Sequence, residues 1–277
     1  ETPNLITTGH AALSAVHGIG NLGDADLYLQ VGSVSAVNSS SGRIVLREVN
    51  GLVVTGLTTQ DGDGDILLSV DTGGLLVNGG ISAHGTGNIR LFTGGIGAIS
   101  ISARVGSEEG LITLVAAGNI TVNAELETEA DVWLQSGGSI AMDGDAEIFA
   151  DNLRLQAAEN LTLGLLQAQA VSLLAGGWIR RAAGSGSNVD AAMLRMTAGT
   201  GIGQALDKLA LDVRTLAAFS AENGMYFDTV GALTVGTVTV TTEFFLLSGA
   251  SSAQEDGGLP VWKPKKAGTS CFWAPEI

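Results

Sequence analysis

Proline is absent from almost the whole chain of 277 residues. Its four prolines are Pro3, Pro260, Pro264 and Pro275, so none lies between residues 4 and 259. Proline has no N–H to donate to a sheet ladder, and its absence over such a length suits an uninterrupted sheet. Apolar residues also keep a helical spacing for no more than a few turns in any segment. The sequence therefore predicts an all-β protein.

Lysine and cysteine are scarce as well. The net charge is −15, and such an acidic surface repels phosphates, so no nucleic acid partner is expected. The single Cys271 permits no internal disulfide and no cysteine metal cluster. Apolar runs are too short for a membrane span, which needs roughly 18 to 20 residues. The start at Glu1 without a signal peptide leads us to expect a mature, processed or excised fragment of an extracellular protein.

The clearest pattern begins at Gly110 with GLITLVAAGNITVNA. Two short apolar alternations, Ile112/Leu114 and Ile120/Val122, are separated there by Ala-Ala-Gly-Asn, and the same rhythm returns about twenty residues later. A period of two places every second side chain on one face of a strand. A strand-and-corner unit that returns at near-constant length is typical of a stacked solenoid.

Copies of this unit can be followed along the chain by the apolar pair that begins each one. The pairs are Leu27/Leu29, Ile44/Leu46, Ile66/Leu68, Ile89/Leu91, Ile112/Leu114, Val132/Leu134, Leu153/Leu155, Val171/Leu173 and Leu194/Met196. Their spacings are 17, 22, 23, 23, 20, 21, 18 and 23 residues. Glycine or aspartate stands two positions before several pairs, as a corner residue would: Gly42, Gly64, Gly87, Gly110 and Asp151.

Each unit also holds a second strand and, in several units, a weaker third one. The second strands are expected at Leu52/Val54, Leu75/Val77, Ile99/Ile101, Ile120/Val122, Ile140/Met142 and Leu161/Leu163, and the third at Ile81, Leu126, Ile148 and Leu166. Three strands per turn of about 20 residues predict a parallel β-helix of about ten coils with a roughly triangular cross-section. The handedness rule for parallel crossovers favours the right-handed form. A β-sandwich is the weaker alternative, because hairpin signals are few.

The two ends depart from this rhythm. Residues 1–19 suit an N-terminal cap, and residues 20–249 form the solenoid, which becomes less regular after 180. Arg180 begins a loop, and Gln204 to Ala218 fits a short helix as well as strands. Residues 250–277 are expected to be a linker followed by an aromatic tail.

The coils GLITLVAAGNITV, DNLRLQAAENLTL and AVSLLAGGWI resemble the repeat region of filamentous-haemagglutinin-like bacterial exoproteins. The segment from Leu194 to Gly203, together with residues 211–217 and 231–238, resembles a unit of very large, repeat-rich bacterial surface proteins. The resemblance covers roughly residues 20–240. It implies a right-handed parallel β-helix, secretion, surface display, and adhesive or fibre-forming roles. No catalytic residues are carried over from this family, and its N-terminal secretion domain is not matched in residues 1–60.

Asp61-Gly-Asp-Gly-Asp65 is the most suggestive local motif. Carboxylates at Asp61, Asp63 and Asp65 could surround a calcium ion, which takes six to eight oxygen ligands. Thr72 stands where an EF-hand-like loop needs a bidentate acid, so an acidic corner in water is the simpler interpretation. No cofactor is expected, with calcium as the one possible exception.

A second acidic group recurs on neighbouring coils. It comprises Glu108, Glu109, Glu125, Glu127, Glu129, Asp131, Asp143, Asp145 and Glu147. These residues could bind cations between subunits or act as the acid pair of a polysaccharide-cleaving β-helix enzyme. A sugar cleft also needs stacking aromatics or a basic partner, and Trp133 is the only aromatic within the group. A solvated face that keeps the protein soluble is the plainer interpretation.

The histidines and the C-terminal tail complete the candidates. His10, His17 and His84 lack an acidic, serine or cysteine partner at a recognisable spacing and are expected at caps or corners. The tail carries four interface candidates: Trp262, Cys271, Phe272 and Trp273. They could cover the last coil or dock onto another copy to make a head-to-tail filament.

The patterns and the resemblance together lead us to expect a non-enzymatic, secreted β-solenoid, a segment of a bacterial surface adhesin or of a self-assembling fibre. Expected partners are further copies of the chain and a host or matrix surface. The alternatives are a carbohydrate-active β-helix enzyme, either lyase or hydrolase, and a calcium-dependent binding module at Asp61 to Asp65.

Overall fold

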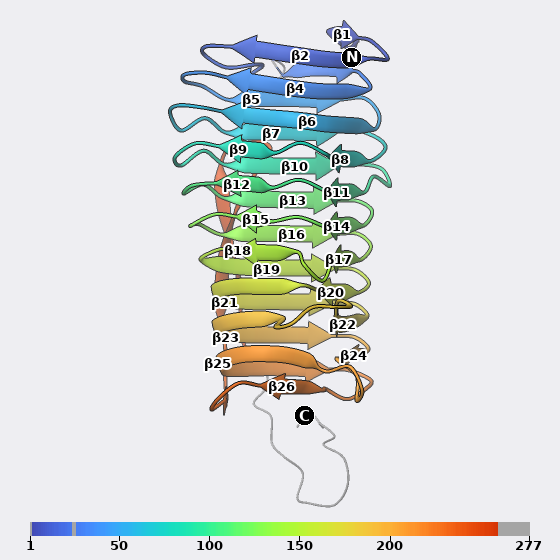
Figure 1. Cartoon of the computed structure of the whole chain (residues 1–277), viewed down its shortest axis with the longest axis vertical. Helices are drawn as coiled ribbons and strands as arrows, with labels where there is room; N and C mark the ends of the chain where they lie inside the picture. Colours follow the sequence, from blue (N-terminus) through green and yellow to red (C-terminus); the bar gives the residue numbers. More distant parts are fainter. Residues whose placement is uncertain (1, 24–25, 260–277) are drawn as a thin grey trace, which may run out of the picture.

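The computed structural model describes residues 2–23 and 26–259 of the chain. Nearly all strands of this part belong to one 27-stranded parallel assembly that winds into about ten turns, and no helix occurs among the described residues. The turns stack along one axis, with the N-terminal coil at one end (Figure 1). The fold is a right-handed parallel β-helix, as the sequence predicts.

Each turn has three sides, which we name the first, second and third faces in chain order. The first face holds β1 (Leu5–Ile6), β3 (Leu27–Gln30), β5 (Ile44–Glu48), β7 (Ile66–Val70), β10 (Ile89–Thr93), β13 (Ile112–Ala116), β16 (Val132–Ser136), β19 (Asn152–Ala157) and β27 (Thr234–Val235). The second face holds β8 (Leu75–Val77), β11 (Ile99–Ile101), β14 (Ile120–Val122), β17 (Ile140–Met142), β20 (Leu161–Leu163), β22 (Trp178–Arg181) and β24 (Gly201–Ile202). The third face holds β9 (Ile81–Ala83), β12 (Val105–Ser107), β15 (Leu126–Glu127), β18 (Glu147–Phe149) and β26 (Phe227–Thr229).

Longer strands turn a corner and serve two faces. Near the N-terminus, β2 (His10–Ala15), β4 (Ser33–Asn38) and β6 (Leu52–Thr59) pair in parallel and extend over the second and third faces. Near the C-terminus, β21 (Leu165–Ala175), β23 (Val189–Ala198) and β25 (Leu209–Ser220) run from the third face onto the first face of the next coil.

The apolar pairs identified in the sequence form the core at the first face. Ile89 pairs with Ile112 and Leu91 with Leu114, and the same register continues to Val132. These side chains are fully buried, because alternation aims every second residue into the coil. The third strands expected at Ile81, Leu126, Ile148 and Leu166 are also present and buried. Stacking therefore converts a repeated two-residue alternation into one continuous core.

Both ends contribute more to the stack than their sequence suggested. Residues 10–15 pair with β4 over six positions, so the segment expected as a cap supplies strands to the first coil. The segment from Gln204 to Ala218 contains most of β25 rather than a helix, and its apolar side chains Leu209, Leu211 and Leu216 are buried. Pairing with β23 therefore determines that this segment is a strand, although its local pattern fits a helix as well.

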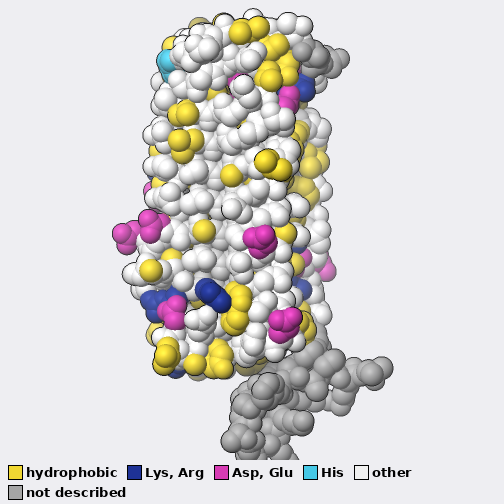
Figure 2. Space-filling model, turned by 90° about the vertical axis from the view of Figure 1, so that its right-hand side faces the viewer, with side chains coloured by type: hydrophobic (Ala, Val, Ile, Leu, Met, Phe, Trp, Pro, Cys, Tyr) yellow, Lys and Arg dark blue, Asp and Glu magenta, His cyan; other side chains and the backbone are white. Residues whose placement is uncertain are grey.

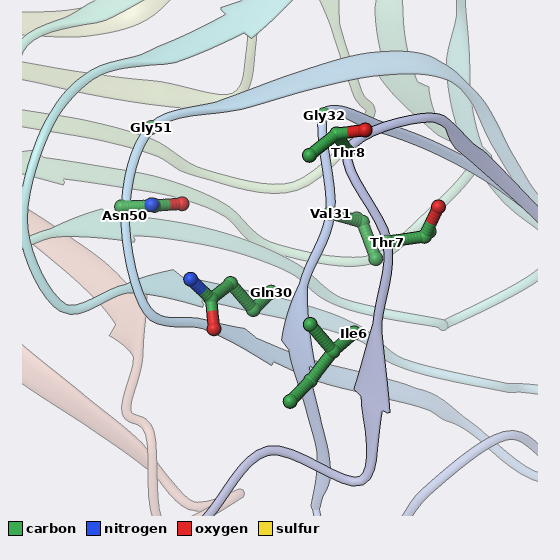
Figure 3. Close-up of a pocket in the computed structure, with 8 residues that line it drawn as sticks. All are labelled: Ile6, Thr7, Thr8, Gln30, Val31, Gly32, Asn50 and Gly51. Carbon is green, nitrogen blue, oxygen red and sulfur yellow. The ribbon is translucent and has the colours of Figure 1, made fainter.

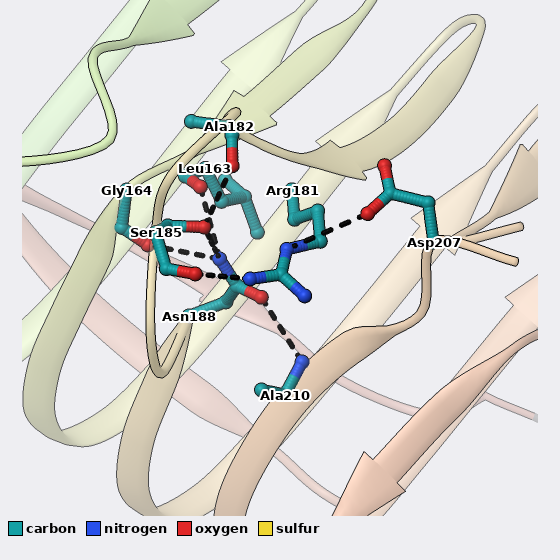
Figure 4. A network of polar contacts seen from close by, with 8 residues as sticks. All are labelled: Leu163, Gly164, Arg181, Ala182, Ser185, Asn188, Asp207 and Ala210. Atoms are coloured by element: carbon teal, nitrogen blue, oxygen red, sulfur yellow. Dashed lines mark hydrogen bonds and ion pairs between the residues drawn. The ribbon is translucent and has the colours of Figure 1, made fainter.

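The loop expected to begin at Arg180 begins after Arg181, because Arg180 and Arg181 belong to β22, and it is held by a buried amide (Figure 4). Asn188 Nδ2 donates to the carbonyl oxygen of Leu163 at 3.0 Å and to Ser185 Oγ at 3.0 Å, and Asn188 Oδ1 accepts the N–H of Ala210 at 3.0 Å. Asn188 has no exposed surface. One side chain thus satisfies backbone groups of two neighbouring coils, which a buried corner requires.

A hairpin, which we call the strap, runs lengthwise over the first face. It consists of β28 (Val240–Phe245) and β29 (Ser251–Asp256), which pair antiparallel to each other (Figure 1, orange to red). Beneath it lies the outward-facing column of the first face, one residue from each coil. The column comprises Val45, Leu67, Arg90, Thr113, Trp133, Arg154, Ser172, Arg195 and Ala217, all buried.

Apolar contacts hold the strap at both ends. Phe245 packs with Val45, Leu67 and Leu111, whereas Val240 packs with Ala170 and Ala217. In the middle, the rings of Phe244 and Trp133 lie 4.4 Å apart. The strap therefore ties the last coils to the early ones, so it stabilises the stack along its axis.

Polar contacts fix the position of the strap along the column. The N–H of Phe245 donates to Thr113 Oγ1 at 2.9 Å, and Arg90 donates to the carbonyl of Phe245. Asp256 forms a buried ion pair with Arg154, with Nε and Oδ2 2.6 Å apart. Burial lowers the pKa of Arg90 to about 10, which leaves its guanidinium charged at neutral pH.

The predicted boundary at residue 249 falls in the turn of this hairpin. Where the sequence predicts a linker, Ser251–Asp256 forms β29. The interface candidates Trp262, Cys271, Phe272 and Trp273 lie outside the described residues.

The second face is nearly uncharged. Its outward column consists of Leu76, Ser100, Thr121, Ala141, Thr162 and Arg180. Figure 2, which views the stack from the right-hand side of Figure 1, accordingly shows few charged side chains, scattered mainly over the lower half. In the described part of the chain, no helix is long and apolar enough to cross a membrane. With the first face covered by the strap, the third face is the side on which polar side chains are both exposed and gathered.

Candidate functional site: a groove along the third face

Two adjoining hollows lie on the third face and share Glu129 and Phe149. One has a volume of about 320 Å³ and lies over β12 and β15, and the other, of about 480 Å³, lies over β18, β21 and β23. We call the pair the third-face groove. Its main lining side chains are those of Arg104, Glu108, Glu127, Glu129, Phe149, Asp151, Gln167 and Asp190.

The floor of the groove is an outward column in strict register. Glu127 pairs with Phe149, Phe149 with Gln167, and Gln167 with Asp190. Neighbouring strands lie about 4.8 Å apart, so these side chains repeat at that distance along the rod. Phe149 is 46% exposed, although it stands in the middle of a strand face rather than at an end of the rod. The column thus presents an open aromatic ring between hydrogen-bonding groups.

Arg104 occupies the N-terminal part of the groove. Its guanidinium lies over Gly106, where a Cβ atom would come within 3.0 Å of it. Arg104 Nε is 3.2 Å from Glu125 Oε2, and the guanidinium also pairs with Glu127. The hydrogen bond that the Arg104 guanidinium donates to Glu127 is the main reason why the pKa of Arg104 is raised. The glycine at position 106 leaves room for the Arg104 guanidinium, which adds a donor beside the carboxylates of Glu108, Glu127 and Glu129.

The acidic group identified in the sequence divides between three environments. Glu129 lines both hollows of the groove, whereas Glu127 and Glu108 line its N-terminal part, where Glu108 accepts the N–H of Gly85 at 3.0 Å. Glu109, Asp143, Asp145 and Glu147 are exposed. Asp131 is buried under the strap, where it accepts the N–H of Glu243 at 2.7 Å and two hydrogen bonds from Asn152 at 3.0 Å. The structure therefore joins only part of the group into one site.

Trp133, the only aromatic residue within this acidic group in the sequence, is not available to a ligand. It is 6% exposed, stacks on Phe244, and lies 4.2 Å from the guanidinium carbon of Arg154. Phe149 is the aromatic side chain in the groove, and it was not among the candidates from the sequence.

The three carboxylates of the Asp61 to Asp65 motif point to different partners. Asp65 is buried, accepts two hydrogen bonds from Asn88, and lies 3.3 Å from Arg43 Nη2. Asp63 accepts the N–H of Thr86 at 3.1 Å, and Asp61 is exposed. Within residues 2–23 and 26–259, no three His, Cys, Asp or Glu side chains lie together as metal ligands.

His10 begins β2, whereas His17 and His84 lie outside strands, and the first two contact serine hydroxyls of the neighbouring coil that their sequence spacing did not reveal. His10 contacts Ser33 Oγ and Ser35 Oγ at 3.0 Å each, and His17 contacts Ser41 Oγ at 3.1 Å. The backbone N–H of His84 donates to Thr59 Oγ1 at 3.2 Å. None of the three lines the third-face groove.

A further hollow of about 410 Å³ lies at the N-terminal corner between the first and second faces (Figure 3). Its walls are Ile6, Thr7, Thr8, Gln30, Val31, Gly32, Asn50 and Gly51. It contains two amide side chains but no charged one. It therefore has less capacity than the third-face groove to orient a polar ligand.

Two buried carboxyls make stability depend on pH. Burial raises the pKa of Glu48 and of Asp131, although backbone N–H groups of Val31 and Glu243 act in the opposite direction. A raised folded-state pKa means that the folded protein binds the proton more tightly than the unfolded chain. Their contribution to stability is therefore greatest below the unfolded values of about 4 and is lost as pH rises through the folded values.

We accordingly expect the protein to melt at a higher temperature at pH 5 than at pH 7.5. Glu48→Gln should reduce that difference, because it removes one of the two groups, whereas Glu255→Gln on the exposed strand β29 should not. Thermal melts of the three proteins at both pH values measure the effect. An unchanged difference in the Glu48→Gln variant would show that Glu48 is not its source.

Comparison of the chain with protein-family models, with curated proteins and with solved structures gives no match. Functional inference therefore depends on the geometry described above.

Proposed function

We propose that this chain is a structural and adhesive β-solenoid, a segment of a bacterial surface protein displayed outside the cell. The observation that carries the proposal is the third-face groove, which lies along the rod and remains open while the strap covers the first face. A rod with one lengthwise contact surface suits adhesion to an extended partner. The resemblance of its coils to filamentous-haemagglutinin-like exoproteins supports the same assignment.

Two structural features suit a mechanical role. The coils follow one another without a long insertion between β7 and β20, so the hydrogen-bonded ladders are continuous there. The strap then connects coils that are far apart along the axis through its contacts at Val45 and Ala217. Force applied to one end is thereby shared between the ladders and the strap.

End-to-end association belongs to the same proposal. Leu5, Leu13 and Ala15 of the first coil are only partly buried, although they pack against the core. An open strand edge with core residues at its margin is a surface on which another coil can pair. A second copy of the chain would continue the same stack.

Binding to a surface without turnover is the expected result. The purified chain, labelled with a fluorophore, should be retained on fixed epithelial cells or on an extracellular-matrix layer, while the same wells release no new reducing ends or unsaturated sugars. Heat-unfolded chain is the control. Lack of retention on every layer would contradict an adhesive function.

A polysaccharide-cleaving enzyme is the second candidate, because Glu127 and Glu129 both line the groove beside Phe149. Release of sugar products, abolished by Glu129→Gln, would favour this candidate over adhesion. Both Glu125 and Glu127 already pair with Arg104, which favours a binding role for that part of the groove.

A further inference from the structure

The third-face groove is long enough for a polymer. Its column extends in register from Ser82 on β9 to Asp190 on β23, through Gly106, Glu127, Phe149 and Gln167. Five steps between neighbouring strands give about 24 Å. The short side chains of Ala150 and Ala168 keep the floor low in the C-terminal part of the groove. A ligand that fills the groove must therefore be extended and parallel to the rod.

Phe149 gives this ligand an apolar contact. Its ring is 46% exposed in the part that both hollows share. From Ser82 to Asp212 the other outward positions of the column are polar or glycine: Ser82, Gly106, Glu127, Gln167, Asp190 and Asp212. An exposed aromatic ring among hydrogen-bonding groups offers a platform for a flat ligand with apolar faces and polar edges.

The polar groups of the groove are mainly acceptors. The carboxylates of Glu129, Asp151 and Asp190 accept hydrogen bonds from hydroxyl groups, and charged acceptors form the stronger kind. Gln167 and Arg104 add donors on either side of Phe149. The same carboxylates repel a polymer that carries its own carboxylates or sulfates. The lining therefore suits a chain rich in uncharged hydroxyls.

The repeat distance separates a glycan from a basic peptide, which would also suit acidic walls. An extended peptide places side chains on one side about every 6.6 to 6.8 Å, and this period falls out of step with coils about 4.8 Å apart. A chain of 1→4-linked pyranose rings instead carries apolar ring faces and hydroxyl-lined edges, which suit an exposed aromatic ring flanked by carboxylates.

We propose that the third-face groove binds an uncharged polysaccharide of β-1,4-linked pyranose rings, which lies parallel to the rod axis with one ring on Phe149. Glu129, Asp151 and Asp190 accept hydrogen bonds from its hydroxyls, and Gln167 and Arg104 donate to it. This inference rests on the proposed adhesive function and names the chemistry of the surface that the protein recognises.

Isothermal titration calorimetry of the full chain tests the proposal. The probes are hexasaccharides of β-1,4-linked glucose, mannose and N-acetylglucosamine, with hexagalacturonate and hexalysine as charged probes of similar length. At least one uncharged hexasaccharide should bind, and Phe149→Ala should weaken that binding at least tenfold. Ile96→Ala, which removes an apolar side chain that is 92% exposed at another corner, should leave it unchanged. Thermal melts confirm that both variants are folded.

Three results would overturn the inference: no binding of any uncharged hexasaccharide, equal binding by the Phe149→Ala variant, or tighter binding of hexalysine or hexagalacturonate. Retention of the chain on cell or matrix layers, combined with any of these, would leave the adhesive function standing and refute only the glycan assignment. Loss of both would refute the adhesive function itself.

Discussion

Replacing Asp256 with alanine is expected to lower the free energy of unfolding by about 3 to 5 kcal/mol, the range for breaking a buried ion pair. Asp256 Oδ2 lies 2.6 Å from Arg154 Nε and accepts a hydrogen bond from Ser172 Oγ at 2.7 Å. The side chains of Asp256 and Arg154 are 8% and 6% exposed. Asp256→Ala would leave the guanidinium of Arg154 buried without its partner, so the strap should separate from the first face.

Urea unfolding followed by circular dichroism measures this loss, and hydrogen exchange of the β28 amides locates it. Glu255→Ala is the matched control, because the neighbouring Glu255 is exposed and should cost within about 0.5 kcal/mol. Adding Arg154→Met to Asp256→Ala should restore part of the stability by removing the unpaired charge. Equal effects of the two alanine substitutions would mean that the ion pair does not hold the strap.

The second large effect is expected at Gly110. Gly42, Gly64, Gly87 and Gly110 lie above one another at the corner before the first face, and a Cβ atom at Gly110 would lie 2.1 Å from the carbonyl oxygen of Gly87. Gly110→Ala should therefore cost about 3 kcal/mol, at the upper end of the range for overpacking, because a backbone carbonyl cannot move without disturbing its ladder. The glycine is required here by close approach of the backbone.

Urea unfolding of Gly110→Ala measures the cost. Gly186→Ala is its control, since nothing lies within 4 Å of a Cβ atom there. If Gly110→Ala unfolds at the same urea concentration as Gly186→Ala, the corner is not tightly stacked and the explanation given for these glycines is wrong.

The solenoid itself could be predicted because its physics is local and repeated. Pairs such as Ile112/Leu114 recur at nearly one-coil intervals, and each recurrence independently indicates a buried strand. The corner glycines could be recognised for the same reason, since Gly87 and Gly110 occupy the same position in successive coils. Repetition made weak single-strand signals reliable.

The strap was missed because its stabilisation is not local. Ser251–Asp256 has no apolar alternation and five exposed residues, so it reads as a linker. It is a strand because β28 pairs with it, and Arg154 and Ser172, more than 80 residues earlier, bind Asp256. The burial of Trp133 could not be predicted for the same reason, since the strap residue Phe244 covers it.

The third-face groove could be predicted only in part. Its acids Glu127 and Glu129 were recognised as a group, but Phe149 and Asp190 were not connected with them. The signal was available in principle: each of Glu127, Phe149, Gln167 and Asp190 directly follows a buried residue of the third strand in its coil. The uneven spacing of the coils, from 17 to 23 residues, hid this column until the register was known.

Competition on a cell or matrix layer tests the central claim, that an intact rod adheres through its third-face groove. Retention of the fluorescent chain is measured with and without the uncharged hexasaccharide that binds most tightly in calorimetry, for the unmodified chain and for Phe149→Ala. The predicted result is retention of the unmodified chain, its displacement by the hexasaccharide, and background retention of Phe149→Ala. Retention of Phe149→Ala at the level of the unmodified chain, undisturbed by the hexasaccharide, would contradict the claim and direct attention to the ends of the rod.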